Sequence, residues 1–516
     1  SLGKILTLGG SGQLQNINDL NLGAGGKLKL SAVSVANVIT SANSLGLEID
    51  DNSTITSLSV SNLTPVSITD GKSLSGGITV NTGGTVQLVD NGTLASNISM
   101  KGGTLDADKS LTISGTVTSA GNFSIDGDSG ITLTFGAGEI RTESYQLTLE
   151  GAGTVAFPAN ASGIVLNHAD GLLKLNGTGT VQAARVIAAS NTGKGVQVVK
   201  SSTISSLTVS ADTKLNIANG ETLSGSTEVA ANKTLSLSGT GTFGSALNLE
   251  GTLEAGANLT VSGAISVADN ATVSIPAANT TLSYSGGNLT VGAHTLEIGG
   301  AGTFSNSSGS PLVLAVEDSV LDLTGNGIIS GPFRLEGGTL KASGSPTISG
   351  DITQYDNATI EVASGQTLTY SGTSLNLGAN ELTLSGGGTF NNSNALVLNN
   401  ADSLLALEGI VTIGNVQATV NASSGKGIQV VESATLGSFD LTATSFLDIA
   451  ANKTINGPIT LNNNADLQIS GNGEYLGNME LAGGKFRVDS NRDLTGTVSV
   501  TASSEIIVPW SLTRPV

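Results

Sequence analysis

Aliphatic and polar residues alternate along most of the chain, in short stretches that end in glycine. The clearest form of this pattern is Leu-polar-Leu-x-Gly-x-Gly, which begins at Leu6, Leu147, Leu173 and Leu235 and at several later leucines. A period of two puts the aliphatic side chains on one face of a strand and the Thr, Ser, Glu or Lys side chains on the other. Glycine then permits the positive φ angles that sharp corners need. The pattern predicts short β-strands and tight turns, and no stretch sustains the spacing of an amphipathic helix.

Long parts of the sequence occur more than once. Gly193–Val199 returns downstream as Gly425–Val431, with a single change from Val to Ile. Upstream, Thr54–Leu58 matches Thr203–Leu207 apart from one change from Thr to Ser, and starts of the strand pattern recur at a shorter, regular period. Repetition of this kind is typical of stacked architectures. We therefore expect three long internal repeats, at about 6–138, 147–292 and 382–516, with an extra block at about 296–380.

Two all-β architectures fit such a pattern, a row of sandwich domains or a solenoid. Sandwich domains would need a boundary about every 100 residues, but no Pro-rich or charged linker interrupts the chain. A solenoid needs only short strands, tight corners and an aliphatic interior. The sequence therefore predicts one continuous β-solenoid over residues 1–516. With roughly 20 to 25 residues per turn and about 4.8 Å between stacked strands, it would be a rod on the order of 100 Å long.

Composition and charge narrow the class of protein. Glycine supplies 70 of the 516 residues, 38% of the chain is hydrophobic, and only 12% is charged. This composition is too aliphatic for a disordered chain. The net charge of −19 argues against nucleic acid as a partner, because an acidic surface repels the phosphate backbone. The absence of cysteine excludes a disulfide framework and thiolate metal sites.

The sequence also bears on location. No apolar run approaches the about 20 residues of a membrane helix, so we expect no membrane-spanning segment. No signal peptide opens the chain, and residue 1 already falls within repeat-like sequence. We interpret the chain as a mature or excised segment of something longer. An acidic surface suits an extracellular or cell-surface protein.

Acidic residues that are close in sequence are the first candidates for chemistry. The pairs are Asp50 with Asp51, Asp106 with Asp108, and Asp126 with Asp128. Asp126 and Asp128 are weak calcium candidates, because short acidic turns supply hard oxygen ligands but the other ligands of a high-affinity loop are missing. We interpret most of these residues as turn aspartates. The doublet at 50–51 corresponds to Val199-Lys200 and Val431-Glu432 in the later copies, so this position is expected to face solvent and to accept either charge.

Signals for catalysis are weak. The two histidines, His168 and His294, lie in different repeats, and His168 corresponds to Asn400 in the duplicate. His168 is therefore interpreted as a turn or surface residue. A sugar-cleaving site usually needs aromatic platforms, whereas the single tryptophan is Trp510 near the end of the chain. The densest basic cluster is interpreted as a solvated strand face; it comprises Lys485, Arg487 and Arg492, interleaved with Asp489 and Asp493. We therefore predict that the chain is not an enzyme and has no cofactor other than the weak calcium site.

Strands such as Leu382–Phe390 and the phrase Gly103-Thr104-Leu105 resemble those of bacterial secreted β-helical exoproteins, namely autotransporter passengers and filamentous-haemagglutinin-like adhesins. The resemblance covers nearly the whole chain. It lies in the general pattern of strands and glycine turns and does not point to one particular protein. It implies a right-handed parallel β-helix, export to the cell surface, and a role in adhesion, filament formation or display.

Together these observations predict a non-catalytic extracellular or cell-surface solenoid that acts as an adhesin stalk or a structural fibre. Its partners would be a host surface, a polysaccharide, or further copies of itself joined end to end or side by side. One alternative is a polysaccharide-binding or polysaccharide-cleaving solenoid of the tail-spike or lyase type. A second alternative is a self-assembling surface-layer or sheath subunit, which would share the fold.

Overall fold

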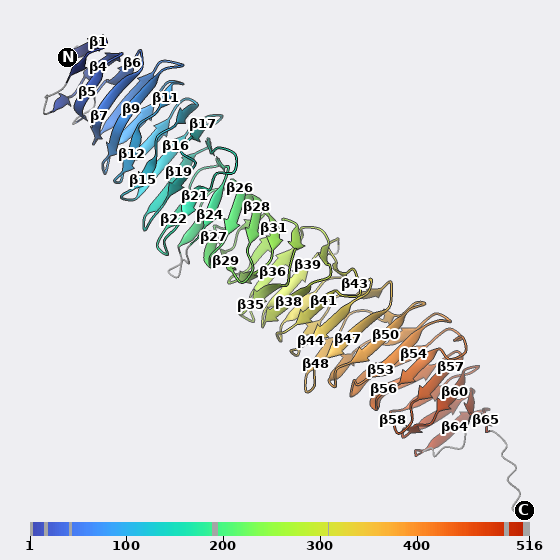
Figure 1. Cartoon of the computed structure of the whole chain (residues 1–516). Coiled ribbons are helices and arrows are strands. Elements are labelled where there is room, and N and C mark those ends of the chain that lie inside the picture. The colour runs from blue at the N-terminus through green and yellow to red at the C-terminus, as the bar shows by residue number, and fades with distance from the viewer. Residues whose placement is uncertain are drawn as a thin grey trace, which may run out of the picture. The chain divides into compact units, whose positions relative to one another are not determined.

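The predicted β-solenoid is confirmed by a computed structural model, which describes residues 4–14, 19–40, 44–187, 194–307, 309–489 and 495–508. Within these residues there is no helix, and parallel strands stack in about 23 turns (Figure 1). No helix that could cross a membrane occurs among them. The predicted residues Gly193, Arg492, Asp493 and Trp510 lie outside the described part of the chain.

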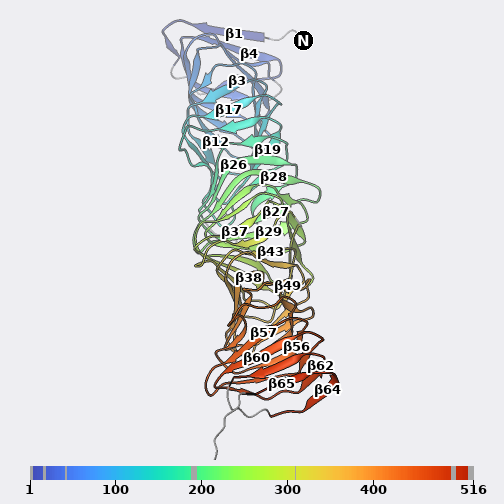
Figure 2. The same ribbon diagram turned by 90° about the vertical axis from the view of Figure 1, so that its right-hand side faces the viewer.

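The chain divides into two compact units, unit 1 (Ser1–Gly263) and unit 2 (Ala264–Val516). The prediction of a single continuous solenoid and the boundaries of the long repeats stay predictions, and each unit is described by itself. Within a unit, each turn adds one strand to a first sheet, sheet A, and either one long strand or two short strands to a second, sheet B. For example, β9 (Ser73–Val80) pairs in parallel with both β11 (Thr93–Leu94) and β12 (Asn97–Met100). Figure 2 shows these stacked turns from a second side.

The remaining strands of unit 1 follow the same scheme. Its sheet A strands are β1 (Lys4–Gly9), β4 (Gly26–Ser31), β6 (Gly46–Ile49), β8 (Leu63–Ile68), β10 (Thr85–Leu88), β13 (Thr104–Ala107), β16 (Phe123–Gly127), β19 (Gln146–Gly151), β22 (Leu172–Leu175), β25 (Gly195–Val198), β27 (Thr213–Ile217), β29 (Thr234–Gly239) and β32 (Thr252–Ala255). Its other sheet B strands are β2 (Gln13–Leu14), β3 (Leu20–Leu22), β5 (Ser34–Thr40), β7 (Ser53–Val60), β14 (Leu111–Ile113), β15 (Val117–Ser119), β17 (Thr132–Phe135), β18 (Glu139–Arg141), β20 (Thr154–Ala156), β21 (Gly163–Leu166), β23 (Thr180–Val181), β24 (Ala184–Val186), β26 (Ser202–Val209), β28 (Thr222–Val229), β30 (Thr242–Phe243), β31 (Ala246–Leu249) and β33 (Leu259–Val261).

Unit 2 adds a small third sheet, sheet C, of β37 (Leu289–Val291), β40 (Leu312–Leu314), β43 (Phe333–Leu335) and β46 (Ile352–Gln354). Its sheet A strands are β35 (Ala271–Ile275), β38 (Thr295–Gly300), β41 (Val320–Leu323), β44 (Thr339–Ala342), β47 (Ala358–Val362), β50 (Glu381–Ser385), β53 (Leu404–Glu408), β55 (Gly427–Val430), β57 (Ser445–Ile449), β60 (Asp466–Gly471), β63 (Lys485–Val488) and β65 (Glu505–Ile507). Its sheet B strands are β34 (Ile265–Val267), β36 (Thr281–Tyr284), β39 (Thr303–Asn306), β42 (Ile328–Ser330), β45 (Thr347–Ile348), β48 (Thr367–Tyr370), β49 (Leu375–Asn376), β51 (Thr389–Asn392), β52 (Leu396–Leu398), β54 (Thr412–Ala418), β56 (Ala434–Leu441), β58 (Thr454–Asn456), β59 (Ile459–Leu461), β61 (Glu474–Tyr475), β62 (Met479–Ala482) and β64 (Val498–Ala502).

The alternation in the sequence places one aliphatic column inside each stack. In unit 1 a buried column rises through consecutive turns of sheet A; it comprises Leu105, Ile125, Leu149, Leu175, Val198 and Ile217. In unit 2 a second column runs from Leu296 to Ile449 in the same way. Burying each such side chain contributes about 1.5–3 kcal/mol. Because parallel register aligns like residues on successive turns, short strands are enough to build a continuous core.

Copies of the repeat fold alike. Strands β7, β26 and β56 begin and end at equivalent residues of the three copies. A glycine recurs at one corner as Gly76, Gly225 and Gly457, with φ of 118°, 119° and 130°. A Cβ atom at Gly225 would lie 1.8 Å from the carbonyl oxygen of Ile204 on the preceding turn. The corner therefore needs glycine both for its φ angle and for the close approach of two backbones.

The shorter period of the sequence also has a structural counterpart in unit 2. The rings of Tyr284 and Phe304 stack at 6.2 Å between centroids, and those of their counterparts one period later, Tyr370 and Phe390, stack at 6.3 Å. Both tyrosines are buried, and their hydroxyl groups accept hydrogen bonds from the backbone N–H of Ile265 and Ile352. Desolvation raises the pKa of both phenols, so these tyrosines are core residues with a satisfied polar end.

Candidate functional site

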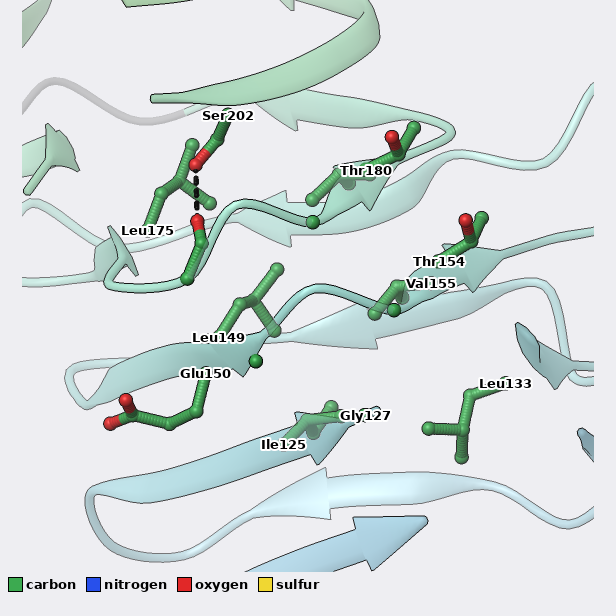
Figure 3. A pocket seen from close by; sticks show the side chains of 15 residues that line it. Ile125, Gly127, Leu133, Leu149, Glu150, Thr154, Val155, Leu175, Thr180 and Ser202 are labelled. Atoms are coloured by element: carbon green, nitrogen blue, oxygen red, sulfur yellow. Dashed lines mark hydrogen bonds between the residues drawn. The ribbon is translucent and has the colours of Figure 1, made fainter. Parts of the chain in front are cut away.

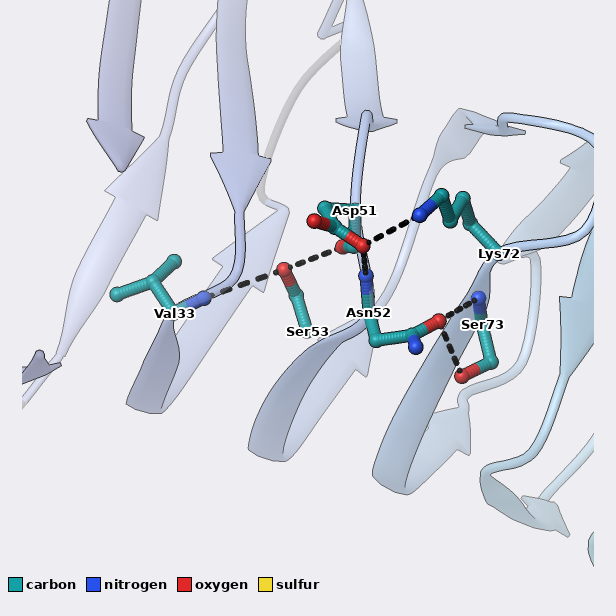
Figure 4. Close-up of polar contacts among 6 residues, drawn as sticks. All are labelled: Val33, Asp51, Asn52, Ser53, Lys72 and Ser73. Carbon is teal, nitrogen blue, oxygen red and sulfur yellow. Dashed lines mark hydrogen bonds and ion pairs between the residues drawn. The ribbon is translucent and has the colours of Figure 1, made fainter. Parts of the chain in front are cut away.

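The acidic doublet at 50–51 lies at a corner where side chains join consecutive turns (Figure 4). The Asp51 carboxylate pairs with the ammonium of Lys72, 2.8 Å away on the next turn. Beside it, Asn52 Oδ1 accepts hydrogen bonds from the N–H and hydroxyl of Ser73. The Ser53 hydroxyl accepts a bond from the N–H of Val33 on the preceding turn. This corner therefore joins three turns through polar contacts.

The later copies keep this corner, and the second copy exchanges its charges. Lys200 and Glu221 occupy the positions of Asp51 and Lys72 in the second copy, where Glu221 accepts bonds from the N–H and hydroxyl of Ser201. In the third copy Glu432 pairs with the ammonium of Lys453. All three copies therefore combine one acid and one base on adjacent turns, in either order. The side chains of Asp50 and Asp51 are 35% and 42% exposed, which agrees with the prediction that this doublet faces solvent, but the compensating partner of position 51 was not foreseen.

The other sequence candidates are spread over the surface. The His168 ring is half-exposed in a turn, and its Nδ1 accepts a bond from the N–H of Asp170. His294 lies in a turn of unit 2, far along the chain. In the basic cluster, Arg487 forms an ion pair with Asp466 on the preceding turn, 2.8 Å away. Within the described residues these groups do not converge on one catalytic centre.

Two of the predicted acidic pairs do come together. Asp106, Asp126 and Glu150 stand in register on β13, β16 and β19, and we call them the acid ladder. The interpretation of Asp106 and Asp126 as turn aspartates is therefore wrong, because both lie within strands. Partial burial, with Asp108, Asp126 and Asp128 nearby, raises the pKa of Asp106 to about 6. Partial burial and Glu150 raise the pKa of Asp126. Within the described chain no lysine or arginine forms an ion pair with any member of the ladder.

The acid ladder lies beside a small hollow in the core of unit 1 (Figure 3). The hollow holds about 20 Å³ and is lined mainly by aliphatic side chains and glycines, among them Leu133, Val155 and Gly153. It is about as large as one water molecule and has too little polar lining to fix one. In Figure 3 the Glu150 carboxylate points away from this hollow. Within the described residues no group of three or more His, Asp or Glu side chains is arranged to hold a metal ion, and calcium at Asp126 and Asp128 stays a prediction.

The larger depression lies in unit 2, mostly on the extra block. This groove has a volume of about 660 Å³, within the usual range of ligand sites. It is bordered by the segments that come directly before β44, β47 and β50 in the chain. Its lining carries five carboxylates, on Glu317, Asp318, Glu336, Asp356 and Glu381. The rest of the lining comprises Gly337, Gly338, Thr339, Asn357, Ala358, Thr359 and Thr383.

One corner of the groove differs from its counterpart in unit 1. Asp170 in unit 1 pairs with Lys194 on the next turn, 3.0 Å away. Strand register places Asp318 at the position of Asp170, and Gly338 at the position of Lys194. A Cβ atom at Gly338 would lie 2.5 Å from the carbonyl oxygen of Ser319, so this backbone position has no room for a side chain. Asp318 therefore lacks the ammonium that its counterpart has.

Arg334 and Tyr355 lie outside the lining of the groove, next to its acids Glu336 and Asp356, and we call these two residues the rim. The guanidinium of Arg334 lies 4.7 Å from the centre of the Tyr355 ring and also pairs with the Glu336 carboxylate. Tyr355 is 58% exposed, so a second face of its ring is open to solvent. Among the described residues, the carboxylates of Glu317, Asp318 and Glu381 have no ion pair with a basic side chain. The groove is thus strongly acidic, with one arginine at its edge.

The sequence interpretation missed this groove. Its acids lie on successive turns and are therefore well separated in the sequence, so only the stacking of turns brings them together. The sequence did contain one signal. The segment that begins at Glu317 aligns with the segment that begins at Ala401, but it lacks a lysine equivalent to Lys426. A comparison of charges at equivalent positions would have found it.

The chain matches no protein-family model, no curated protein and no solved structure. The resemblance to secreted exoproteins therefore stays a prediction.

Proposed function

We propose that the chain is a non-catalytic extracellular or cell-surface solenoid that serves as an adhesin stalk or structural fibre. The observation that carries this proposal is how the outer polar side chains are used. They mostly join one turn to the next, as in the pairs Asp51–Lys72, Asp170–Lys194 and Asp466–Arg487. Each pair links residues 21 or 24 positions apart, which is one turn of the solenoid.

Such contacts suit a chain whose task is to keep its turns stacked. Each exposed pair contributes little on its own, about 0–1 kcal/mol, but the contacts recur along both units. Together with the aliphatic columns, they oppose separation of neighbouring turns without disulfides. The net charge of −19 favours solubility of an exposed chain.

Electron microscopy of the native protein at rising concentration, with and without calcium, tests this proposal. Particles that stay separate support a stalk, and particles that join into regular fibres support a fibre. A parallel assay incubates the protein with a panel of polysaccharides and measures new reducing ends. Release of new ends that depends on the protein would contradict the non-catalytic assignment.

A second candidate function is polysaccharide binding, and the groove of unit 2 favours it. Carboxylates, threonine hydroxyls and an exposed tyrosine are groups that recognise sugars. This function is compatible with a stalk, because a binding groove on a stalk would make it adhesive. A glycan array probed with the labelled native protein distinguishes a binding stalk from an inert one.

A further inference from the structure

We propose that the groove of unit 2 binds a glycan that carries free amino groups, of the chemical class of a glucosamine polymer. This inference goes beyond the proposed stalk role, and the stalk role does not depend on it. It is carried by the charges that the repeats place at equivalent corners, by the row of groups along the groove, and by its rim.

The repeats themselves indicate what the groove lacks. At the corner of Asp170 the chain supplies its own primary ammonium, that of Lys194, 3.0 Å from the carboxylate. At the equivalent corner of the extra block, Asp318 and Gly338 both line the groove, and position 338 carries no side chain. The same carboxylate position therefore binds an ammonium group in unit 1 and is left open to an external one in unit 2. A primary amine is the group that fits there by direct analogy.

The groove repeats its chemistry once per turn. Thr339, Thr359 and Thr383 stand in register on β44, β47 and β50. An acid lies two or three residues before each threonine. In chain order these acids are Glu336, Asp356 and Glu381. A row of alternating carboxylate and hydroxyl groups suits a polymer whose units each carry an amine and several hydroxyls. Strand spacing sets the row at about 4.8 Å per turn.

Hydrogen bonds hold the backbone of two of these acids, Asp356 and Glu381, in place. The Gln354 side-chain amide donates to the carbonyl oxygens of Asp356 and Glu381, on two neighbouring turns. Asn357 Oδ1 accepts a bond from the N–H of Glu381. Gln354 is 7% exposed, so this support lies beneath the groove. A preformed site loses little entropy when a ligand binds.

The lining and rim favour a sugar over a basic peptide. Ala358 is the one hydrophobic residue that lines the groove, so the groove has no apolar pocket for peptide side chains. The exposed ring of Tyr355 offers a flat apolar face at the rim, with Arg334 on its other side. An aromatic face of this kind packs against a sugar ring and also attracts an amine.

The test is calorimetric titration of the native full-length chain with a glucosamine oligomer. The matched ligand control is the N-acetylated oligomer of equal length, which keeps the hydroxyls and loses the charge. We expect saturable binding of the first and at least about fivefold weaker binding of the second, because the charge pairs are lost. Binding should weaken as NaCl is raised, because salt screens exposed charges.

The test variant combines Asp318→Asn with Glu381→Gln, and the matched control is Glu408→Gln, an exposed acid of unit 2 outside the groove. The test variant should weaken binding about five- to tenfold, and Tyr355→Ala should weaken it separately. Thermal unfolding of each variant verifies that the fold is kept. Equal binding by the test variant and the control, or equal binding of the acetylated oligomer, would overturn the proposal. Tighter binding of a lysine-rich peptide or of spermidine than of the oligomer would overturn the glycan assignment.

Discussion

Two stretches of sheet A in unit 1 arrange charge on the same outer face in opposite ways. On β4 and β6, Glu48 lies between Lys27 and Lys29, and both ammonium groups pair with it. We call these three residues the paired ladder. On β13, β16 and β19 the acid ladder stacks Asp106, Asp126 and Glu150 with no base between them. The backbone and the aliphatic column beneath are alike in the two stretches.

The pKa values follow this difference. Hydrogen bonds from Lys27 and Lys29 lower the pKa of Glu48 to about 2, whereas partial burial and neighbouring acids raise the pKa of Asp106 to about 6. The solenoid therefore tolerates either arrangement, because its stability comes mainly from the buried columns. The outer residues determine how the stability of each stretch responds to pH and salt.

The largest effect should come from exchanging the two arrangements. Asp126→Lys would place an ammonium between Asp106 and Glu150 and should stabilise the acid ladder by about 1 kcal/mol at about pH 7. Glu48→Lys would put three lysines together and should destabilise the paired ladder by a similar amount. Hydrogen exchange of the backbone amides in each stretch measures both changes. Changes of the same sign in the two variants would contradict the account.

A smaller effect is expected from the Asp106 carboxylate alone. Its pKa in the folded state, about 6, lies above the value of 3.8 for the free side chain. The folded chain therefore holds the proton more tightly, so the stabilisation is complete below about pH 3.8 and is lost as pH rises through about 6. Asp106→Asn should stabilise this stretch at about pH 7, by less than about 1 kcal/mol because the group is partly exposed.

The control for that variant is Asp212→Asn, a turn acid of unit 1 outside both ladders. Stability measured against pH should lose its slope near pH 6 in Asp106→Asn and keep it in Asp212→Asn. If both variants keep the slope, the titrating group is not Asp106.

The paired ladder should respond in the opposite direction and by a few tenths of a kcal/mol. The folded-state pKa of Glu48, about 2, lies below the 4.5 of the free side chain. Its ion pairs therefore stabilise the fold above about pH 4.5, and this contribution is lost as pH falls toward 2. Glu48→Gln should remove that acid-side loss, and amide exchange in β4 and β6 from about pH 5 to about pH 3 would measure it.

Salt should give the smallest effect. Raising NaCl screens repulsion in the acid ladder and attraction in the paired ladder, so the first stretch should gain stability and the second should lose it. Each change should amount to a few tenths of a kcal/mol, because both sets of charges are partly exposed and salt screens them only in part. Amide exchange at low and high NaCl tests this, and a loss of protection in both stretches would count against it.

The fold could be predicted from the sequence because its two causes are local. Alternation, as in Leu235-Ser236-Leu237, sets which side chains point inward, and glycines such as Gly225 mark the corners. The repeats could be recognised in the sequence because equivalent strands have the same length in each copy. These features need no knowledge of which turns are neighbours.

The pairing of outer residues could not be predicted, because it depends on the length of each turn. Asp126 stacks on Asp106 and Glu150 stacks on Asp126, but the turn between the second pair is longer than the turn between the first. Turns of unequal length leave the register open until the backbone is known. For the same reason the sequence presents Asp106 and Asp126 as separate turn acids, and it does not reveal the groove formed around Asp318 and Glu381.

The most direct test of the central claim is amide hydrogen exchange of the unmodified chain at about pH 7 and about pH 5, corrected for the intrinsic effect of pH. We expect β13 and β16 to gain protection at the lower pH, because Asp106 takes up a proton with a pKa of about 6. We expect no change in β4 and β6, because Glu48 stays ionised over this range. Equal gains in both stretches, or a loss of protection in β13 and β16, would contradict the claim that outer charges set the local response.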